Sequence, residues 1–280
     1  MPYLKVSNPR PGRPLPVFIV NARRITQSLS LLLLNSSWGP ELKWFCAPVL
    51  NCHSCSLAWF ACPIGVFVHY AGYRVFPFLA VGTVLLLGVL LGRLLCGWIC
   101  PFGLLQDLLH KIPGPKFGLP RWTRGIKYGV LLGLVVAAPF FLGEQTMFSF
   151  CRVCPASALQ VTAPNAMRAG FIGLETATLI KLAILVAVLV LAVICCRSFC
   201  RVFCPLGALL APLNFISFWT VKVPVNDCRS CGKCDALCPV EGKPSLRVAG
   251  GVHPGRAPEC IACNECRSAC PREGAGNGDA

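Results

Sequence analysis

The chain has 280 residues, of which 55% are hydrophobic and only 13% are charged. This composition excludes an ordinary soluble domain and indicates a membrane protein. The net charge of +15 does not indicate a nucleic-acid partner, because the basic residues lie in the gaps between apolar runs rather than in one tail or on one face.

The apolar runs come after a proline-rich N-terminal segment, residues 1–22, which we expect to be a cytoplasmic tail without a long helix. Three runs are close to the ~20 residues that a bilayer requires, and a shorter first run needs tilt or local thinning to cross. The four predicted spans are Ile25–Trp38, Pro77–Leu95, Ile126–Gly143 and Leu179–Ile194.

The distribution of charge supports four spans with the N-terminus inside. In that arrangement the inner segments 1–24, 93–127 and 197–280 hold 21 of the 26 lysines and arginines, as the positive-inside rule requires. We therefore expect a multi-pass protein of the cytoplasmic (inner) membrane, with both termini in the cytoplasm.

The sequence also repeats. Four tetrapeptides begin with Cys-Pro, at Cys62, Cys100, Cys154 and Cys204, and they alternate between the outer and inner faces in the four-span arrangement. Two units of the same orientation imply a pseudo-two-fold axis along the membrane normal, and sites on that axis take ligands from both units. The alternative is chance recurrence in a chain rich in cysteine and proline.

Twenty cysteines is a high count for this length, and their spacings are those of metal sites. The polar segment 224–280, called the C-terminal module below, contains two Cys-x2-Cys-x2-Cys-x3-Cys-Pro runs, which are typical of two-cluster ferredoxins. The fourth cysteine of each run normally ligates the other cluster. The predicted ligand sets are Cys228, Cys231, Cys234 and Cys270 for one [4Fe–4S] cluster, and Cys260, Cys263, Cys266 and Cys238 for the other. Paired zinc sites are the alternative.

Two further motifs follow membrane spans at the inner face, Cys96-Gly-Trp-Ile-Cys100-Pro101 and Cys200-Arg-Val-Phe-Cys204-Pro205. A spacing of i, i+4 would place both sulfurs of a pair on one helix face, and two pairs would supply four thiolates for a third cluster. We call Cys96, Cys100, Cys200 and Cys204 the inner set. Each proline would begin a helix whose free backbone N–H groups face the sulfurs. The alternative is buried, inert thiols.

With these motifs the chain resembles the membrane polyferredoxins, among them the NapH-like quinol-dehydrogenase membrane component of periplasmic nitrate reductase and the polyferredoxins of cytochrome oxidase assembly. The resemblance implies cytoplasmic ferredoxin clusters and electron transfer linked to the quinone pool or to metal reduction.

The chain departs from that group in a second group of cysteines, predicted at the outer face. We call Cys52, Cys55, Cys62, Cys151 and Cys154 the outer set; Cys46 lies nearby. Our hypothesis is that Cys151 and Cys154 join two of Cys52, Cys55 and Cys62 around an outer [4Fe–4S] cluster. Disulfides in an oxidising compartment are the alternative.

The predicted fold is an all-α four-helix membrane domain of two pseudo-repeats over residues 23–223, followed by a small α+β ferredoxin-like domain. The sequence contains no dinucleotide loop, P-loop or haem-attachment motif, so we expect a subunit of a larger complex with redox partner proteins at one or both faces. The predicted function is electron relay among the clusters to a quinone or an outer-face partner. Alternatives are an inner-face quinol dehydrogenase subunit without an outer cluster, a copper reductase of oxidase assembly, and a zinc scaffold without redox function.

Overall fold

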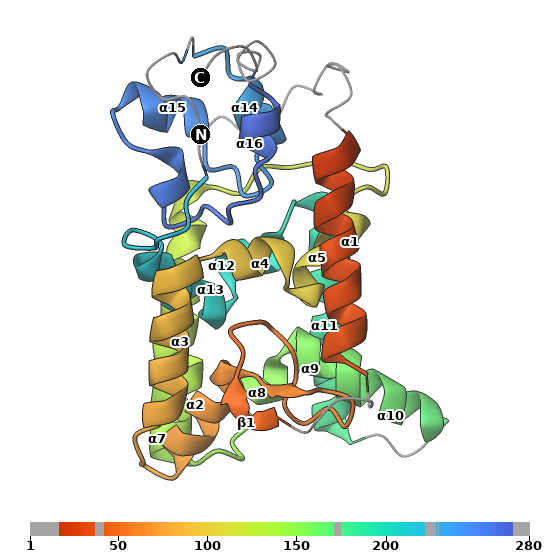
Figure 1. Ribbon diagram of the computed structural model, residues 1–280. Helices are drawn as coiled ribbons and strands as arrows, with labels where there is room; N and C mark the ends of the chain where they lie inside the picture. Colours follow the sequence, from red (N-terminus) through yellow and green to blue (C-terminus); the bar gives the residue numbers. More distant parts are fainter. Residues whose placement is uncertain (1–16, 37–41, 171–174, 222–227, 229, 271–280) are drawn as a thin grey trace.

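The computed structural model describes residues 17–36, 42–170, 175–221, 228 and 230–270. Its helices stand in two columns, one containing α1 (Val17–Leu34) and α11 (Thr176–Ile194), the other containing α3 (Phe78–Leu91) and α7 (Ala138–Leu142) (Figure 1). The C-terminal module lies at one end of the columns. The loops around the outer set occupy the other end.

Two of these helical segments are long and apolar enough to cross a membrane, Arg121–Leu142 and Thr176–Ile194, as judged over the described residues by length and composition. They coincide with the third and fourth predicted spans. The predicted second span is shorter than expected, because α3 ends after Leu91, where Gly92 has a φ of +56° that glycine adopts readily. The helix predicted from Ile25 begins already at Val17, directly after Pro16, the last proline of the N-terminal run.

The segment Arg121–Leu142 changes its helical form along its length. It runs through η1 (Arg121–Gly125, a 3₁₀ helix), α6 (Ile126–Val130), η2 (Leu131–Ala137, a π-helix) and α7. A second π-helix, η3 (Ala158–Thr162), precedes α10 (Ala163–Arg168). A proline follows each π-helix within two residues, Pro139 and Pro164. Because proline donates no N–H, the regular i→i−4 ladder is interrupted there.

Each of the four Cys-Pro dipeptides begins a helix, with the cysteine as an extended N-cap residue and the proline in the first turn. Proline disfavours a helical conformation in the residue before it, and its missing N–H costs nothing at a helix start. The prediction of helix-starting prolines is confirmed. The four helices are α2 (Pro63–Gly72), α5 (Pro101–Leu109), α9 (Pro155–Ser157) and α13 (Pro205–Leu213).

The packing of α5 and α13 shows how the two units interlock. Helix α5 packs against α1 of its own unit and α11 of the other; α13 packs against α6 of its own unit and α3 of the other. Each inner Cys-Pro helix therefore joins the first helix of its own unit to the later long helix of the other unit, α11 for α5 and α3 for α13. This exchange is the pattern that a pseudo-two-fold arrangement produces.

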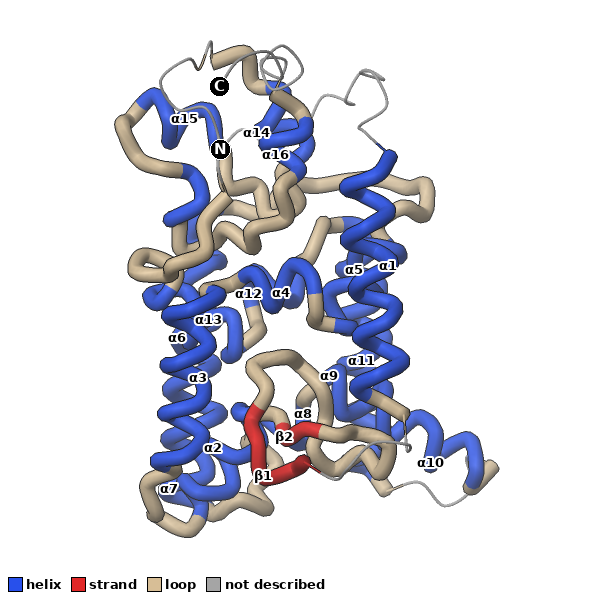
Figure 2. The backbone as a smooth tube through the Cα atoms, viewed as in Figure 1, coloured by secondary structure: helices blue, strands red, loops and turns tan. Residues whose placement is uncertain are grey.

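At the end remote from the C-terminal module, two short strands form a parallel pair, β1 (Leu42–Cys46) with β2 (Phe60–Ala61). The loop between them curls towards the centre of the molecule (Figure 2). Helix α8 (Phe150–Val153) lies next to this loop and packs against α2 and α11. This loop and α8 carry most of the outer set.

The C-terminal module is built from short helices: α14 (Lys233–Leu237), α15 (Pro244–Ala249), η4 (Pro254–Arg256) and α16 (Glu265–Ser268). No strand occurs between residues 230 and 270, where we expected an α+β domain. Pro239, Pro244, Pro254 and Pro258 divide this stretch and cannot donate to a strand ladder. Residues 222–227 and 271–280 lie outside the described part of the module.

Candidate metal centres

The inner set lies between the two helix columns, on the helices α4 (Leu94–Trp98) and α12 (Ser198–Val202) and just beyond them (Figure 1). Our prediction that each pair shares one helix face is wrong. Both helices end before their second cysteine, because the proline that follows Cys100 or Cys204 forces that cysteine into an extended conformation. A turn between two helices, rather than one helix, brings the paired sulfurs together.

All four cysteines of the inner set are buried and lie within electrostatic reach of one another. Burial raises the pKa of the Cys200 thiol to about 12 against the opposing effect of Arg197, and Cys100 and Cys96 add to the rise. Four buried thiols this close together cannot all ionise unless positive charge is placed among them. An iron–sulfur cluster supplies that charge, so the donor set fits one.

Protein N–H groups point at these sulfurs. The backbone N–H of Gly207 donates to the Cys204 sulfur over 3.4 Å, and the Gln106 amide donates to the Cys200 sulfur over 3.1 Å. The backbone N–H of Gly103 lies within electrostatic reach of the Cys100 sulfur. Such donors stabilise a negatively charged cluster and raise its reduction potential. Gln106 is completely buried, and our sequence analysis did not identify it.

Two buried arginines were also missed. Arg93 is 1% exposed and Arg197 is 0% exposed, and each precedes the first cysteine of its motif by three positions. Arg197 donates to the Cys96 carbonyl over 3.0 Å, across the pseudo-two-fold. The Arg93 guanidinium lies against the opposite motif, where a Cβ on Gly207 would come within 3.1 Å of it. The repeated pattern Arg-x2-Cys-x3-Cys-Pro-x-Gly was the signal that could have revealed both.

Each arginine has a buried carboxylate partner. Arg197 donates two hydrogen bonds to Asp107, over 2.8 and 2.6 Å, and Arg23 of α1 pairs with the same carboxylate. Burial opposes the ionisation of Asp107, but Arg197 and then Arg23 outweigh it and hold the pKa of this carboxyl below its usual range. The ion pair with Asp107 holds the Arg197 guanidinium in a fixed position beside the inner set.

The partner of Arg93 is Glu259 of the C-terminal module. Its carboxylate lies 3.2 Å from Arg93 and 2.5 Å from Lys127, whose side chain is completely buried. Burial again opposes ionisation, but Arg93 and Lys127 hold the pKa of Glu259 below its usual range. The residue after Glu259 is Cys260, so this ion-pair cluster attaches a predicted ferredoxin ligand directly to the two helix columns.

Neighbouring contacts extend this attachment. The Trp98 indole donates to the Ala262 carbonyl over 2.9 Å, and Ile261 is buried in the same core as Cys96 and Cys263. A Cβ on Gly97 would lie only 2.2 Å from the Ile261 carbonyl oxygen. Helix α4 thus carries a ligand of the inner set on the surface that receives the C-terminal module.

We expect Gly97→Ala to lower the free energy of unfolding by about 1–3 kcal/mol and to weaken this attachment, because the added methyl group meets a backbone oxygen that cannot rotate away. Thermal melting followed by the loss of cluster absorbance, together with limited proteolysis of the C-terminal module, measures the effect. Gly82→Ala is the matched control: it is also a helical glycine, no atom lies within 4 Å of its added Cβ, and it should be neutral or slightly stabilising. Equal melting temperatures for the two variants would contradict the prediction.

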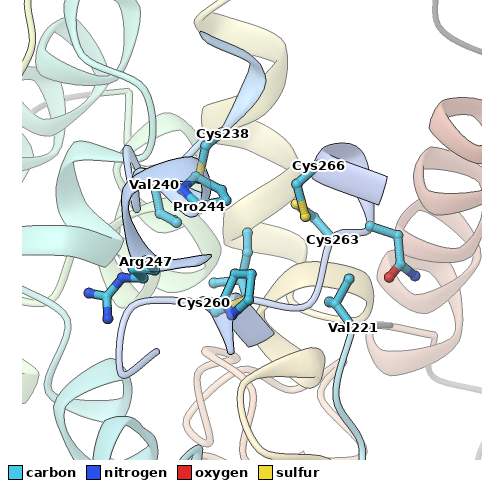
Figure 3. A pocket seen from close by; sticks show the side chains of 11 residues that line it. Val221, Cys238, Val240, Pro244, Arg247, Cys260, Cys263 and Cys266 are labelled. Atoms are coloured by element: carbon cyan, nitrogen blue, oxygen red, sulfur yellow. The ribbon is translucent and has the colours of Figure 1, made fainter. Parts of the chain in front are cut away.

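In the C-terminal module, the second predicted ligand set is assembled. Cys238, Cys260, Cys263 and Cys266 line one pocket, and their sulfurs gather around it (Figure 3). In the first set, Cys234 lies within electrostatic reach of Cys228 and Cys231, and the packing of α14 against α16 places the two runs side by side. Cys270, the predicted fourth ligand of the first set, follows α16 and is half-buried.

At the opposite end, four of the five cysteines of the outer set line a second pocket, which we call the outer pocket: Cys52, Cys62, Cys151 and Cys154. Cys62 and Cys151 each lie within electrostatic reach of the other members of this group. Cys55 does not line the pocket. It belongs to a small buried cluster with Cys52, Ala58 and Val161.

Among the described residues, no three histidine, cysteine or acidic side chains converge closely enough to hold a single metal ion. This holds even for Cys238, Cys260, Cys263 and Cys266.

Comparison with known proteins identifies two iron–sulfur regions. The family described as "4Fe-4S binding domain" matches residues 73–120 and 178–222, which contain the whole inner set. The family described as "4Fe-4S dicluster domain" matches residues 220–271, with all eight cysteines of the C-terminal module. The chain is an iron–sulfur protein with ferredoxin-like 4Fe–4S domains.

Two curated relatives are similar to the chain. The uncharacterized protein MJ0750 of Methanocaldococcus jannaschii is 31% identical over 171 residues, 58% of this chain and 64% of the relative. The "Putative electron transport protein YccM" of Escherichia coli is 29% identical over 163 residues, 55% of this chain and 43% of the relative. The match thus spans less than two thirds of either relative. No solved structure matches the chain. Together, the domains and the relatives support iron–sulfur electron transfer.

Proposed function

We propose that the chain is a membrane electron relay, in which electrons pass between the two ferredoxin clusters of the C-terminal module and a third cluster held by the inner set. Bound [4Fe–4S] clusters supply one-electron transfer. The polypeptide holds them close together, excludes water and provides fixed N–H groups and cations at their thiolates.

The attachment of the C-terminal module to α4 is the observation that carries this proposal. The segment that contains Cys260 and Cys263 lies directly against the helix that contains Cys96, and Cys263 shares a buried core with Cys96 and Cys100. Electron tunnelling falls steeply with distance, so ligand segments in van der Waals contact favour rapid transfer between their clusters. The buried ion pairs of Arg93 and Lys127 with Glu259 maintain the contact.

The membrane part of the proposal is a four-span domain in the cytoplasmic membrane, with the C-terminal module in the cytoplasm. Two described helices are long and apolar enough to span, and α1 and α3 stand beside them in the same two columns. Of the 26 lysines and arginines, 21 fall on the predicted inner side. We further propose, from the resemblance to NapH-like polyferredoxins, that the exchange partner is a quinone or a redox protein of a larger complex.

The test is a double variant, Cys96→Ser/Cys200→Ser, which removes one inner ligand from each unit. The variant should lose about four iron atoms and keep the clusters of the C-terminal module. In proteoliposomes that contain decylubiquinone, quinol formation driven by a photoreduced flavin outside should fall to the rate of liposomes without protein. Iron and acid-labile sulfide assays, electron paramagnetic resonance and quinol absorbance measure these effects.

Retention of the C-terminal cluster signals shows that the variant has folded. Unchanged iron content in the variant would overturn the assignment of the inner set. If the variant loses four iron atoms but still forms quinol at an unchanged rate, the inner cluster does not lie on the electron-transfer pathway.

A further inference from the structure

The outer pocket joins the two units of the repeat. Cys52 and Cys62 come from the first unit and Cys151 and Cys154 from the second, and all four side chains line the same cavity. Neither matched iron–sulfur region includes any of these residues. The pocket therefore holds a set of four thiols for which the matched domains give no role.

Two of these cysteines repeat the local design of the inner set. Cys62 and Cys154 are extended N-cap residues before a proline, as Cys100 and Cys204 are. The backbone N–H of Gly65 lies near the Cys62 sulfur and that of Ser157 near the Cys154 sulfur, three positions after each cysteine, as those of Gly103 and Gly207 lie near the sulfurs of the inner set. The same preorganised thiolate site thus occurs at both ends of each unit.

The outer pocket is close to the inner set. The backbone N–H of Leu50 lies within electrostatic reach of the Cys100 sulfur, and Cys52, two positions later, lines the outer pocket. Two residues span at most about 7 Å. Leu50, Cys62 and Cys154 also belong to the buried core that contains Cys96 and Cys100. The pocket is therefore sunk towards the centre of the molecule and adjoins the inner set.

The charged groups at the pocket are two cations, Arg152 and Lys181, and one carboxylate, Glu144, which pairs with His69. Four thiolates around an oxidised cubane carry a net negative charge, which a buried site must offset. Lys181 of α11 lies within electrostatic reach of Cys151 and Cys154, and its ammonium group donates to Ser157 over 2.8 Å. Lys181 thus supplies positive charge near the thiols of the outer pocket, as Arg93 and Arg197 do near those of the inner set.

We propose that Cys52, Cys62, Cys151 and Cys154 hold a fourth [4Fe–4S] cluster, adjoining the cluster of the inner set. This inference deepens the proposed function by extending the relay beyond the inner set, towards the end of the molecule remote from the C-terminal module. Cys52 and Cys62 line the pocket together with Cys151 and Cys154. Cys55 and Cys46 do not line it and are packed in small buried clusters.

The experiment compares the full chain with the double variant Cys151→Ser/Cys154→Ser, both purified anaerobically in detergent. The full chain should contain about 16 iron atoms and as many sulfides, and the variant about 12, since each cubane holds four. The matched control is Cys55→Ser, a buried cysteine beside the pocket that does not line it, which should keep the full iron content. The single variant Cys52→Ser, which alters a loop rather than a helix start, should also lose the fourth cluster's resonance.

Several results would overturn the inference. One is an iron content of about 12 atoms in the full chain, and another is an unchanged iron content in both cysteine variants of the pocket. The others are zinc at the pocket in place of iron, and disulfides among its four cysteines. Each of these leaves the proposed function intact, because the inner set and the C-terminal module then still hold about 12 iron atoms. Failure of the proposed function itself would appear separately, as the loss of no iron in Cys96→Ser/Cys200→Ser.

Discussion

Replacing Glu259 by glutamine should detach the C-terminal module from the two helix columns. The change removes the carboxylate that Arg93 and Lys127 share and leaves two buried cations, 2% and 0% exposed at their side chains, without a counter-charge. Breaking a buried ion pair in this way costs about 3–5 kcal/mol. The expected result is a lower melting temperature, release of the module by limited proteolysis and slower electron transfer between the C-terminal and inner clusters.

A matched control is Glu241→Gln, the same chemical change in the same module. Glu241 pairs with the buried Arg201, but the Glu241 side chain is 35% exposed, so water can replace it and the cost should be on the order of 1 kcal/mol. The double variant Lys127→Met/Glu259→Gln should recover part of the lost stability, because one unpaired cation is removed. If Glu259→Gln melts like the unaltered chain and resists proteolysis, the ion-pair cluster does not hold the module.

The second large effect concerns the potential of the inner cluster. Arg197→Gln removes a completely buried positive charge beside Cys200 and Cys96 but keeps an amide donor in its place. A reduced cluster carries one more negative charge than an oxidised one, so loss of the cation should disfavour reduction. With an effective dielectric constant of about 20 the change is on the order of 1–2 kcal/mol, which lowers the one-electron potential by roughly 50–100 mV.

A redox titration monitored by electron paramagnetic resonance measures this shift. Arg93→Gln, its counterpart across the pseudo-two-fold, should shift the potential in the same direction. Arg121→Gln is the matched control, since Arg121 is exposed and screened by solvent and should leave the potential unchanged. A potential that rises or stays constant in Arg197→Gln would contradict an electrostatic role for this side chain.

Much of this architecture follows from local sequence. The eight cysteines of the C-terminal module, the inner set and the helix-starting Cys-Pro dipeptides were predictable, because cluster-binding loops and proline act over a few neighbouring residues. The apolar runs likewise predicted the segments that became Arg121–Leu142 and Thr176–Ile194. The same proline rule, applied more strictly, would have shown that Cys96 and Cys100 cannot share one helix.

Relations between distant segments, in contrast, could be found only in the folded chain. The choice of Cys52 and Cys62 over Cys55 depends on how one loop curls beside α8, which no spacing specifies. The pairing of Arg93 and Lys127 with Glu259 joins three segments far apart in the chain, and charge in a sequence is ordinarily expected at the surface. Local motifs were therefore enough to predict which thiols of the C-terminal module and the inner set could bind iron–sulfur clusters. Packing across the pseudo-two-fold determined which of the remaining thiols meet, and which buried charges face them, because these depend on long-range contacts rather than on local conformation.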